Sequence, residues 1–215
     1  MLHPEISVIY ADSALLVLNK PSGLLCVPGR GPDKQDCLSS RVSEIYPDAR
    51  IVHRLDMATS GLLLMARGPL YQKMLSQAFA ERTIRKRYIA VVDGLLPTQA
   101  EEWSVIDMPI ALDWPNRPLR IIDANNGKPS CTRWRVLRHD AGNQTTRLEL
   151  EPITGRSHQL RVHLQALRHP ILGDVWYGSS GAQAKAQRLL LHASRLELIH
   201  PANSQPITFA SEPEF

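Results

Sequence analysis

The most constraining feature of the chain is a run of five apolar residues, Leu62-Leu63-Leu64-Met65-Ala66, that follows directly on a polar turn. A short apolar run bounded by turn residues predicts a strand that is buried on both faces. The turn, residues 53–61, reads His-Arg-Leu-Asp-Met-Ala-Thr-Ser-Gly. We therefore expect Asp56 to lie where a polar loop enters a core strand, and rigid elements with polar loops commonly hold catalytic groups. The alternative is that Asp56 only forms an Asx turn ahead of Thr59-Ser60-Gly61.

Elsewhere the residue pattern predicts short strands joined by turns. Residues 6–10 and 15–19 are expected to pair, and residues 132–138 and 145–153 form a hairpin signal around Asp140-Ala141-Gly142-Asn143. Further strands are expected at residues 88–92 and 189–199. Residues 96–130 are rich in proline and glycine, and we expect them to form a loop-rich excursion from the core.

Helical spacing appears in three places. One helix is expected from Leu38 to Tyr46 with Asp36 as its cap, one from Pro69 to Phe79, and one from Ser157 to Arg168. Strands outnumber helices and are often joined by hairpins. The predicted class is therefore α+β, with a mixed, mostly antiparallel sheet and flanking helices.

Composition narrows the class of protein. A length of 215 residues with 43% hydrophobic residues suits a single domain over residues 1–215 with a sizeable core. The cysteines, Cys26, Cys37 and Cys131, are odd in number and widely spaced, which predicts neither a disulfide framework nor a structural metal. The N-terminus lacks the pattern of a signal peptide, and the apolar runs are too short for a membrane span. We expect a soluble, cytoplasmic protein.

The net charge is only +4, so the placement of the basic residues is more informative than their number. They gather in four groups: Arg82, Arg85, Lys86 and Arg87; Arg117 and Arg120; Arg133 and Arg135; and His158, Arg161 and Arg168 with Gln165. Each group alone is compatible with an ordinary solvated surface. Together they suggest a phosphate-binding surface, in which Tyr88 is a platform for base stacking.

Several chemistries lack their sequence signatures. There is no GxxxxGK[ST] loop for nucleoside triphosphates, and Ser60 lacks the flanking glycines of a nucleophile elbow. His158 and His163 are five residues apart on a predicted helix, about 140° around its axis, which is too far for joint metal ligation. What remains is a lone carboxylate, several guanidiniums and one well-placed tyrosine.

Six segments, in order along the chain, resemble the RluA-type pseudouridine synthases. The turn at residues 53–61 matches the catalytic signature of that family in full. The others are Asn19-Lys20-Pro21-Ser22-Gly23-Leu24, Lys86-Arg87-Tyr88-Ile89-Ala90, Gly155-Arg156-Ser157-His158-Gln159-Leu160-Arg161, His169-Pro170-Ile171-Leu172-Gly173-Asp174 and Leu189-Leu190-Leu191-His192-Ala193. The resemblance extends from about residue 6 to the C-terminus.

The resemblance implies the pseudouridine synthase catalytic fold and the isomerisation of uridine to pseudouridine in structured RNA. The N-glycosidic bond breaks, the uracil turns, and its C5 bonds to the same ribose carbon. Such a reaction needs no cofactor and no metal. One carboxylate suffices, by analogy with glycosidases that pass through oxocarbenium-like states. Whether the aspartate attacks ribose, attacks the base or removes a ribose proton stays open.

Roles for single residues follow from the same resemblance. Asp56 would be catalytic, Arg161 would pair with it and keep it ionised, and Tyr88 would stack on the extruded uracil. Arg54 would stabilise the flipped-out arrangement, and Leu190 would form an apolar wall. The other residues expected to contact RNA are His53, Lys86, Arg87, Arg117, Arg156 and His158.

The expected partner is RNA of defined loop shape. Many family members carry an N-terminal S4-type domain, for which we expect no room here. The segment Asp113-Trp114-Pro115-Asn116-Arg117-Pro118 resembles the branch of the family that modifies a tRNA anticodon stem-loop and a 23S rRNA hairpin. The alternative functions are a non-catalytic RNA-binding protein on the same scaffold and an Asp-dependent nucleosidase or glycosidase. For residues 113–118 the alternative is a plain surface loop. A monomer is expected.

Overall fold

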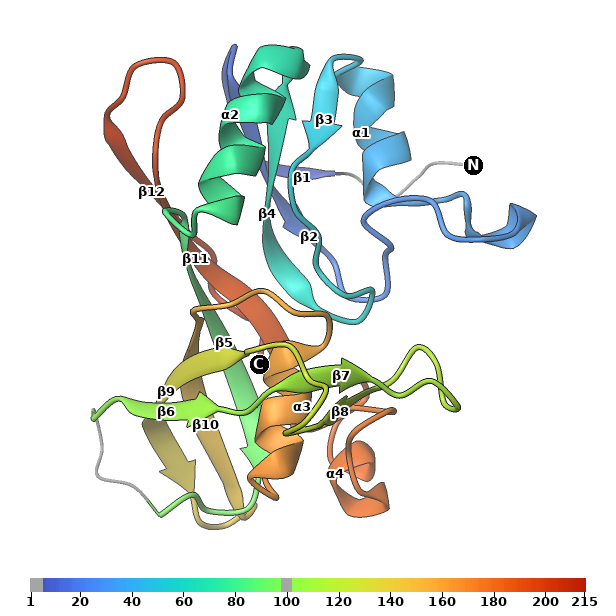
Figure 1. Cartoon of the computed structure of the whole chain (residues 1–215), viewed down its shortest axis with the longest axis vertical. Helices are drawn as coiled ribbons and strands as arrows, with labels where there is room; N and C mark the ends of the chain where they lie inside the picture. The colour runs from blue at the N-terminus through green and yellow to red at the C-terminus, as the bar shows by residue number, and fades with distance from the viewer. Residues whose placement is uncertain (1–5, 98–101) are drawn as a thin grey trace. The chain divides into compact units, whose positions relative to one another are not determined.

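The computed structural model describes residues 6–97 and 102–215, and these form two compact units (Figure 1). Unit 1 comprises residues up to Lys86 together with His192–Glu214, and unit 2 comprises Arg87–Leu191 with Phe215. The single domain that we expected over residues 1–215 stays a prediction. In the described part of the chain, no helix combines the length and the apolar character that crossing a membrane requires.

The sheet of unit 1 is built around β4 (Ser60–Arg67). On one side of β4, β2 (Leu15–Lys20) is antiparallel and carries β1 (Ser7–Ala11) at its far edge. On the other side, β11 (Leu191–Ile199) runs parallel to β4 and pairs with β12 (Pro206–Ala210), while β3 (Ala49–Ile51) adds a short antiparallel ladder to β4. The expected pairing of residues 6–10 with 15–19 is confirmed.

Strand β4 is the buried core element that its sequence predicted. Every residue from Ser60 to Ala66 is buried, and Leu62 and Leu64 pack in a cluster with Leu75 of α2 (Gly68–Ala80). Gly61 closes the signature turn with φ of +107°, and a Cβ there would collide with the backbone of Ala193 on β11. The turn therefore needs glycine at this position.

Helix α1 (Leu38–Ile45) begins differently from the prediction, which had Asp36 as its cap. The cap is Cys37, whose Sγ accepts a hydrogen bond from the backbone N–H of Ser40 at 3.4 Å. Asp36 instead forms a bidentate ion pair with Arg41, whose Nε and Nη2 donate to the two carboxylate oxygens at 2.7 and 2.6 Å. A short 3₁₀ turn, η1 (Pro32–Lys34), precedes this helix.

The sheet of unit 2 has the order β5-β10-β9-β6. Strand β10 (Thr145–Pro152) is antiparallel both to β5 (Arg85–Asp93) and to β9 (Cys131–Asp140), and β6 (Ser104–Asp107) closes the outer edge. The predicted hairpin of residues 132–138 and 145–153 is therefore confirmed. Together with unit 1, this sheet confirms the α+β class.

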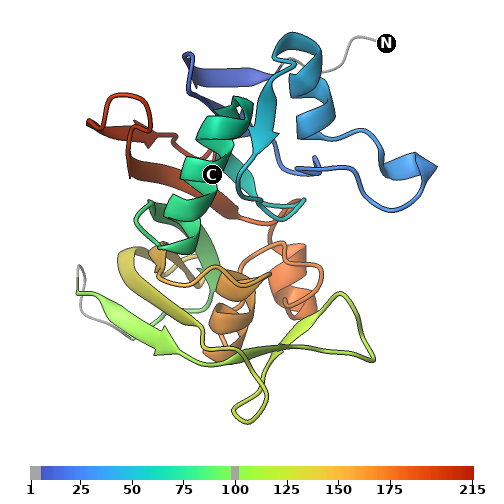
Figure 2. The ribbon, with the colours of Figure 1, turned by 45° about the horizontal axis from the view of Figure 1, so that its top comes forward.

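Helix α3 (Gln159–Ala166) begins later than the predicted Ser157, because His158 adopts the left-handed conformation with φ of 57° and precedes the first turn. Within the expected excursion at residues 96–130, β7 (Ile110–Leu112) and β8 (Arg120–Ile122) form a two-stranded hairpin. The loop of this hairpin extends well beyond its strands (Figure 2, yellow-green). Residues 98–101 of the excursion lie outside the described part. Helix α4 (Ser180–Ala184) is short and lies towards the C-terminal end of the Arg87–Leu191 stretch of unit 2.

Candidate active site

Asp56 lies in the loop between β3 and β4 of unit 1 and is half-buried. The loop turns tightly after it, because the backbone N–H of Thr59 donates to the carbonyl of Asp56 at 3.1 Å. Its neighbour Leu55 is buried and Met57 is exposed, so the loop has one face in the core and one in solvent. This is the placement that the apolar run after the turn predicted.

Lys20 supports this loop from the end of β2, a role that the sequence did not reveal. Its side chain is fully buried, and Nζ donates to the carbonyls of Pro21 and Leu24 at 2.8 Å each and to that of Met57 at 3.0 Å. Burial lowers the pKa of Lys20 to about 8, while the nearby Cys26 and Asp56 act in the opposite direction. The three carbonyl acceptors stabilise an ammonium that would otherwise be costly to bury.

Arg54 is exposed, as a residue that contacts RNA must be. His53 has a different environment. Its Nε2 accepts a hydrogen bond from the backbone N–H of Leu64 at 2.9 Å, and its ring stacks on Phe79 with a centroid distance of 4.4 Å. Burial, with a smaller effect of the Lys86 charge, lowers the pKa of His53 to about 3. A neutral, core-facing imidazole favours a structural role for His53 over the RNA contact that we expected.

The lowered pKa of His53 predicts acid sensitivity. Because the pKa of His53 is about 3 in the fold and 6.5 in its unperturbed state, the unfolded chain binds more protons between these values, and this part of the stability is lost as the pH falls from about 6.5 towards 3. In His53→Gln, the side-chain amide oxygen can accept from Leu64 without titrating. We expect urea unfolding of His53→Gln to lose less stability than the parent chain between pH 7 and pH 4. Equal losses would contradict the assignment.

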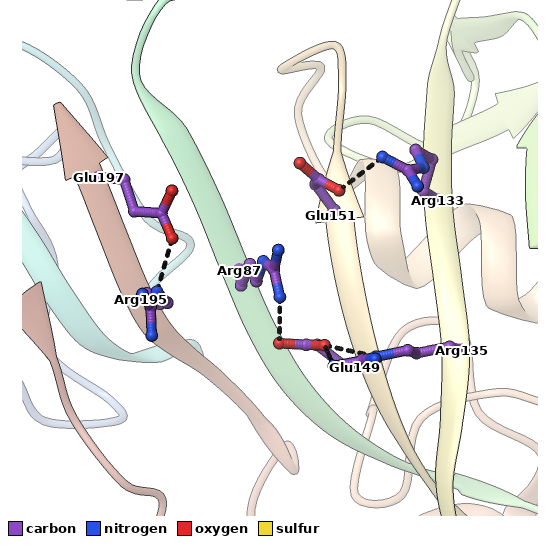
Figure 3. A network of polar contacts seen from close by, with 7 residues as sticks. All are labelled: Arg87, Arg133, Arg135, Glu149, Glu151, Arg195 and Glu197. Carbon is purple, nitrogen blue, oxygen red and sulfur yellow. Dashed lines mark hydrogen bonds and ion pairs between the residues drawn. The ribbon is translucent and has the colours of Figure 1, made fainter. Parts of the chain in front are cut away.

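Three basic residues of β5 and β9 are paired with carboxylates (Figure 3). Arg87 and Arg135 both bind Glu149, at 3.2 and 2.6 Å, and Arg133 binds Glu151 at 3.2 Å. All three guanidiniums also lie 4.8–5.5 Å from the centre of the Trp103 ring. These three guanidiniums are therefore bound to carboxylates, which does not favour the phosphate-binding surface that the grouping of basic residues suggested.

The other residues of that basic group differ from one another. Arg82 and Arg85 are exposed, whereas Lys86 is half-buried with its Nζ 5.7 Å from the centre of the Phe79 ring. Burial lowers the pKa of Lys86, and the charge of Arg82 adds to the effect. On β11 of unit 1, a separate ion pair joins Arg195 and Glu197 at 2.6 Å (Figure 3).

Tyr88 lies on the opposite face of β5 from Arg87, because successive side chains of a strand alternate. It pairs across the sheet with Leu150, which in turn pairs with Trp134. This is the face on which α3 packs, since Nδ1 of His163 is 2.9 Å from the hydroxyl of Thr132, which lies two residues before Trp134 and so on the same face of β9. Tyr88 and α3 therefore share one face of the unit 2 sheet.

Arg161 of unit 2 is fixed by hydrogen bonds and by aromatic neighbours. Its guanidinium is buried, and Nε and Nη2 donate to the two carboxylate oxygens of Asp174 at 2.7 Å each. The guanidinium carbon also lies 5.0 and 4.9 Å from the ring centres of Trp176 and Tyr177. Asp174 accepts in addition from the backbone N–H groups of these two residues. The bidentate pair and the two neighbouring aromatic rings together restrict the orientation of the guanidinium.

Asp174 is a functional candidate that sequence reasoning missed. It stands in one of the six family segments, but no role was assigned to it. His158 completes this cluster: its Nδ1 is 2.7 Å from the hydroxyl of Tyr177, and its ring centre is 5.0 Å from that of Trp176. The Tyr177 hydroxyl also accepts from the backbone N–H of Arg120 at 2.9 Å, which ties the cluster to β8.

The remaining predicted residues are accessible to different degrees. Arg117 stacks on Trp114 in the β7–β8 loop, 4.8 Å from the ring centre, and the Trp114 side chain is 66% exposed. Arg156 is exposed, and its Nε donates to the carbonyl of Pro129 at 3.3 Å. Leu190 is half-buried, and its backbone lies between Val91 and Leu172. Asp56 belongs to unit 1 whereas Tyr88 and Arg161 belong to unit 2, so the pairing of Asp56 with Arg161 stays a prediction.

Comparison with known proteins assigns the chain to a class. Residues 14–166 match the family described as RNA pseudouridylate synthase. This match covers more than half of the 215 residues, and the chain belongs to that family. It is therefore an isomerase that converts uridine to pseudouridine in RNA, as the six segments implied.

Individual relatives agree with this assignment. The protein named dual-specificity RNA pseudouridine synthase RluA from Escherichia coli K12 is 47% identical over 99% of this chain and 95% of its own length. Its namesake from Haemophilus ducreyi is 45% identical over 100% of this chain and 96% of its own. The solved structure of human RNA pseudouridylate synthase domain containing 1 has a TM-score of 0.79 at 30% identity, and covers 100% of this chain and 87% of its own.

Proposed function

We propose that this enzyme modifies a uridine in a tRNA anticodon stem-loop and a uridine in a 23S rRNA hairpin, with Asp56 as its catalytic residue. The observation that carries the substrate range is the 45–47% identity, over nearly the whole chain, to relatives named dual-specificity enzymes. The presence of Asp56 in a complete nine-residue signature at the entrance to β4 carries the choice of catalytic residue.

The proposed chemistry needs few groups. The bond between N1 and the ribose carbon breaks, the uracil turns within the site, C5 bonds to the same carbon, and the C5 proton is lost while N1 gains one. The carboxylate of Asp56 assists as a nucleophile or base. Tyr88 would stack on the extruded uracil, a contact worth about 1–3 kcal/mol. Exposed Arg54 would help to stabilise the flipped-out arrangement.

Arg161 would hold Asp56 ionised and oriented. Its bidentate pair with Asp174 and its two aromatic neighbours support this role, because they leave the guanidinium little freedom to reorient. The exposed pair of Trp114 and Arg117 in the β7–β8 loop offers a stacking surface and a charge to an RNA loop. We also propose that the enzyme acts as a monomer in the cytoplasm.

The test is tritium release from RNA labelled with [5-³H]uridine, because the C5 hydrogen is lost when C5 bonds to the ribose. Transcripts of a tRNA and of a 23S rRNA hairpin are assayed in parallel, each beside a copy with its target uridine changed to cytidine. We expect release from both RNAs that depends on the target uridine. Release from only one would contradict the dual range, and release from neither would contradict the proposed substrates.

A further inference from the structure

We propose that the thiol of Cys26 is a positioning group for Asp56: it binds the backbone on the N-terminal side of that residue and thereby sets where the carboxylate lies. The inference rests on the proposed catalytic role of Asp56. It concerns unit 1 alone, in which the segment that follows β2 lies along the loop that precedes β4 (Figure 1).

The loop is held by this segment, residues 20–26, which we call the clamp segment. Beyond Asp56, the carbonyl of Met57 accepts from Nζ of Lys20 at 3.0 Å and from the backbone N–H of Gly23 at 2.8 Å. The next carbonyl, that of Ala58, accepts from the hydroxyl of Ser22 at 2.7 Å. Three hydrogen bonds therefore hold the backbone on the C-terminal side of Asp56.

On the N-terminal side, Cys26 provides the side-chain contact. Its Sγ accepts from the backbone N–H of Leu55 at 3.2 Å and donates to the carbonyl of Leu55, also at 3.2 Å. Leu55 directly precedes Asp56, and Cys26 itself is 3% exposed. Burial raises the pKa of the Cys26 thiol, so it keeps the hydrogen that it donates. One side chain thus binds both polar groups of the residue before Asp56.

Such a contact affects catalysis more than affinity. A displacement of about 1 Å at a catalytic group can cost about 10²-fold in rate, whereas RNA binding is distributed over many phosphate contacts. Losing the bonds of Cys26 should leave the C-terminal side of the loop held and allow the carboxylate to shift. The rate of the chemical step should fall, and the affinity for RNA should not.

Cys37 offers a matched control on the same stretch of chain. It is fully buried as well, but its Sγ caps α1 and lies 3.3 and 3.1 Å from the hydroxyls of Ser39 and Ser40. Cys37→Ala therefore removes a buried thiol and its hydrogen bonds from the same unit without removing a contact to residues 55–58. It reports what a merely structural loss does to the enzyme.

The experiment compares Cys26→Ala, Cys26→Val, Cys26→Ser and Cys37→Ala under reducing conditions. Single-turnover tritium release at saturating enzyme gives the rate of the chemical step, and filter binding gives the affinity for the same RNA. We expect Cys26→Ala and Cys26→Val to react about 10–100-fold more slowly than the parent, with affinities within about twofold. Cys26→Ser keeps a donor and an acceptor and should recover most of the rate. Cys37→Ala should react at the parental rate.

Valine fills the space of the thiol without making hydrogen bonds, so Cys26→Val takes the place of Cys26→Ala in this comparison if the alanine variant does not fold. The proposal is overturned if a folded Cys26→Ala or Cys26→Val enzyme reacts as fast as Cys37→Ala. It is also overturned if the affinity of these Cys26 variants for RNA falls in proportion to their rate of tritium release. Asp56→Asn in the same assay separates this inference from the proposed function. An active Asp56→Asn enzyme would refute the catalytic role of Asp56, whereas an inactive one beside a fast Cys26→Ala enzyme would refute only the role of Cys26.

Discussion

Replacing Asp56 by asparagine should reduce pseudouridine formation by about 10³-fold or more, the scale on which a lost nucleophile or base slows other enzymes. Asparagine has nearly the same shape, but it carries no charge and neither attacks carbon nor accepts a proton at neutral pH. The loop should keep its conformation, because its hydrogen bonds to the clamp segment are made by the backbone of Leu55, Met57 and Ala58. The measurement is tritium release together with filter binding and urea unfolding.

Asp48→Asn is the matched control for this prediction. Asp48 also belongs to unit 1 and forms an ion pair at 2.7 Å with Arg67, so the same chemical change there removes a charge without touching the signature turn. We expect near-parental turnover for Asp48→Asn. A loss of RNA binding in Asp56→Asn as large as its loss of turnover would show that Asp56 serves binding rather than chemistry.

Replacing Asp174 by alanine should lower the free energy of unfolding by about 3–5 kcal/mol, the cost of removing one partner from a buried ion pair. The Asp174 side chain is 0% exposed and that of Arg161 is 4% exposed, so the variant leaves a buried guanidinium without this carboxylate. The backbone N–H groups of Trp176 and Tyr177 lose their acceptor as well. Turnover should also fall, because Arg161 loses the contact that orients it.

Urea unfolding of Asp174→Ala should be compared with that of Asp93→Ala. Asp93 pairs with Lys185 at 2.6 Å in the same unit, but the two side chains are 29% and 37% exposed. Solvent-exposed pairs contribute about 0–1 kcal/mol, so the control should change little. Equal and small losses in the two variants would mean that the Arg161–Asp174 pair does not stabilise unit 2.

Sequence reasoning succeeded where local pattern determines structure. The apolar run at residues 62–66 required a buried strand, and the turn at residues 140–143 required a hairpin. Both depend on neighbours along the chain, through side-chain alternation and turn chemistry. The helix starts were predicted less well. Cys37 and His158, rather than Asp36 and Ser157, precede α1 and α3, because the surrounding fold selects the backbone conformation at these positions.

The candidate site likewise has features that the local sequence predicted and features that only the fold revealed. The sequence by itself determined the family, the chemistry and the turn that presents Asp56, because a catalytic signature is a contiguous string of residues. Only the tertiary structure showed that Arg133 and Arg135 are paired with glutamates, that Arg161 is held by Asp174, and that Cys26 binds Leu55. Cys26 and Leu55 are 29 residues apart in sequence. The charge and freedom of each group depend on burial and on partners distant in sequence, and packing alone brings those partners together.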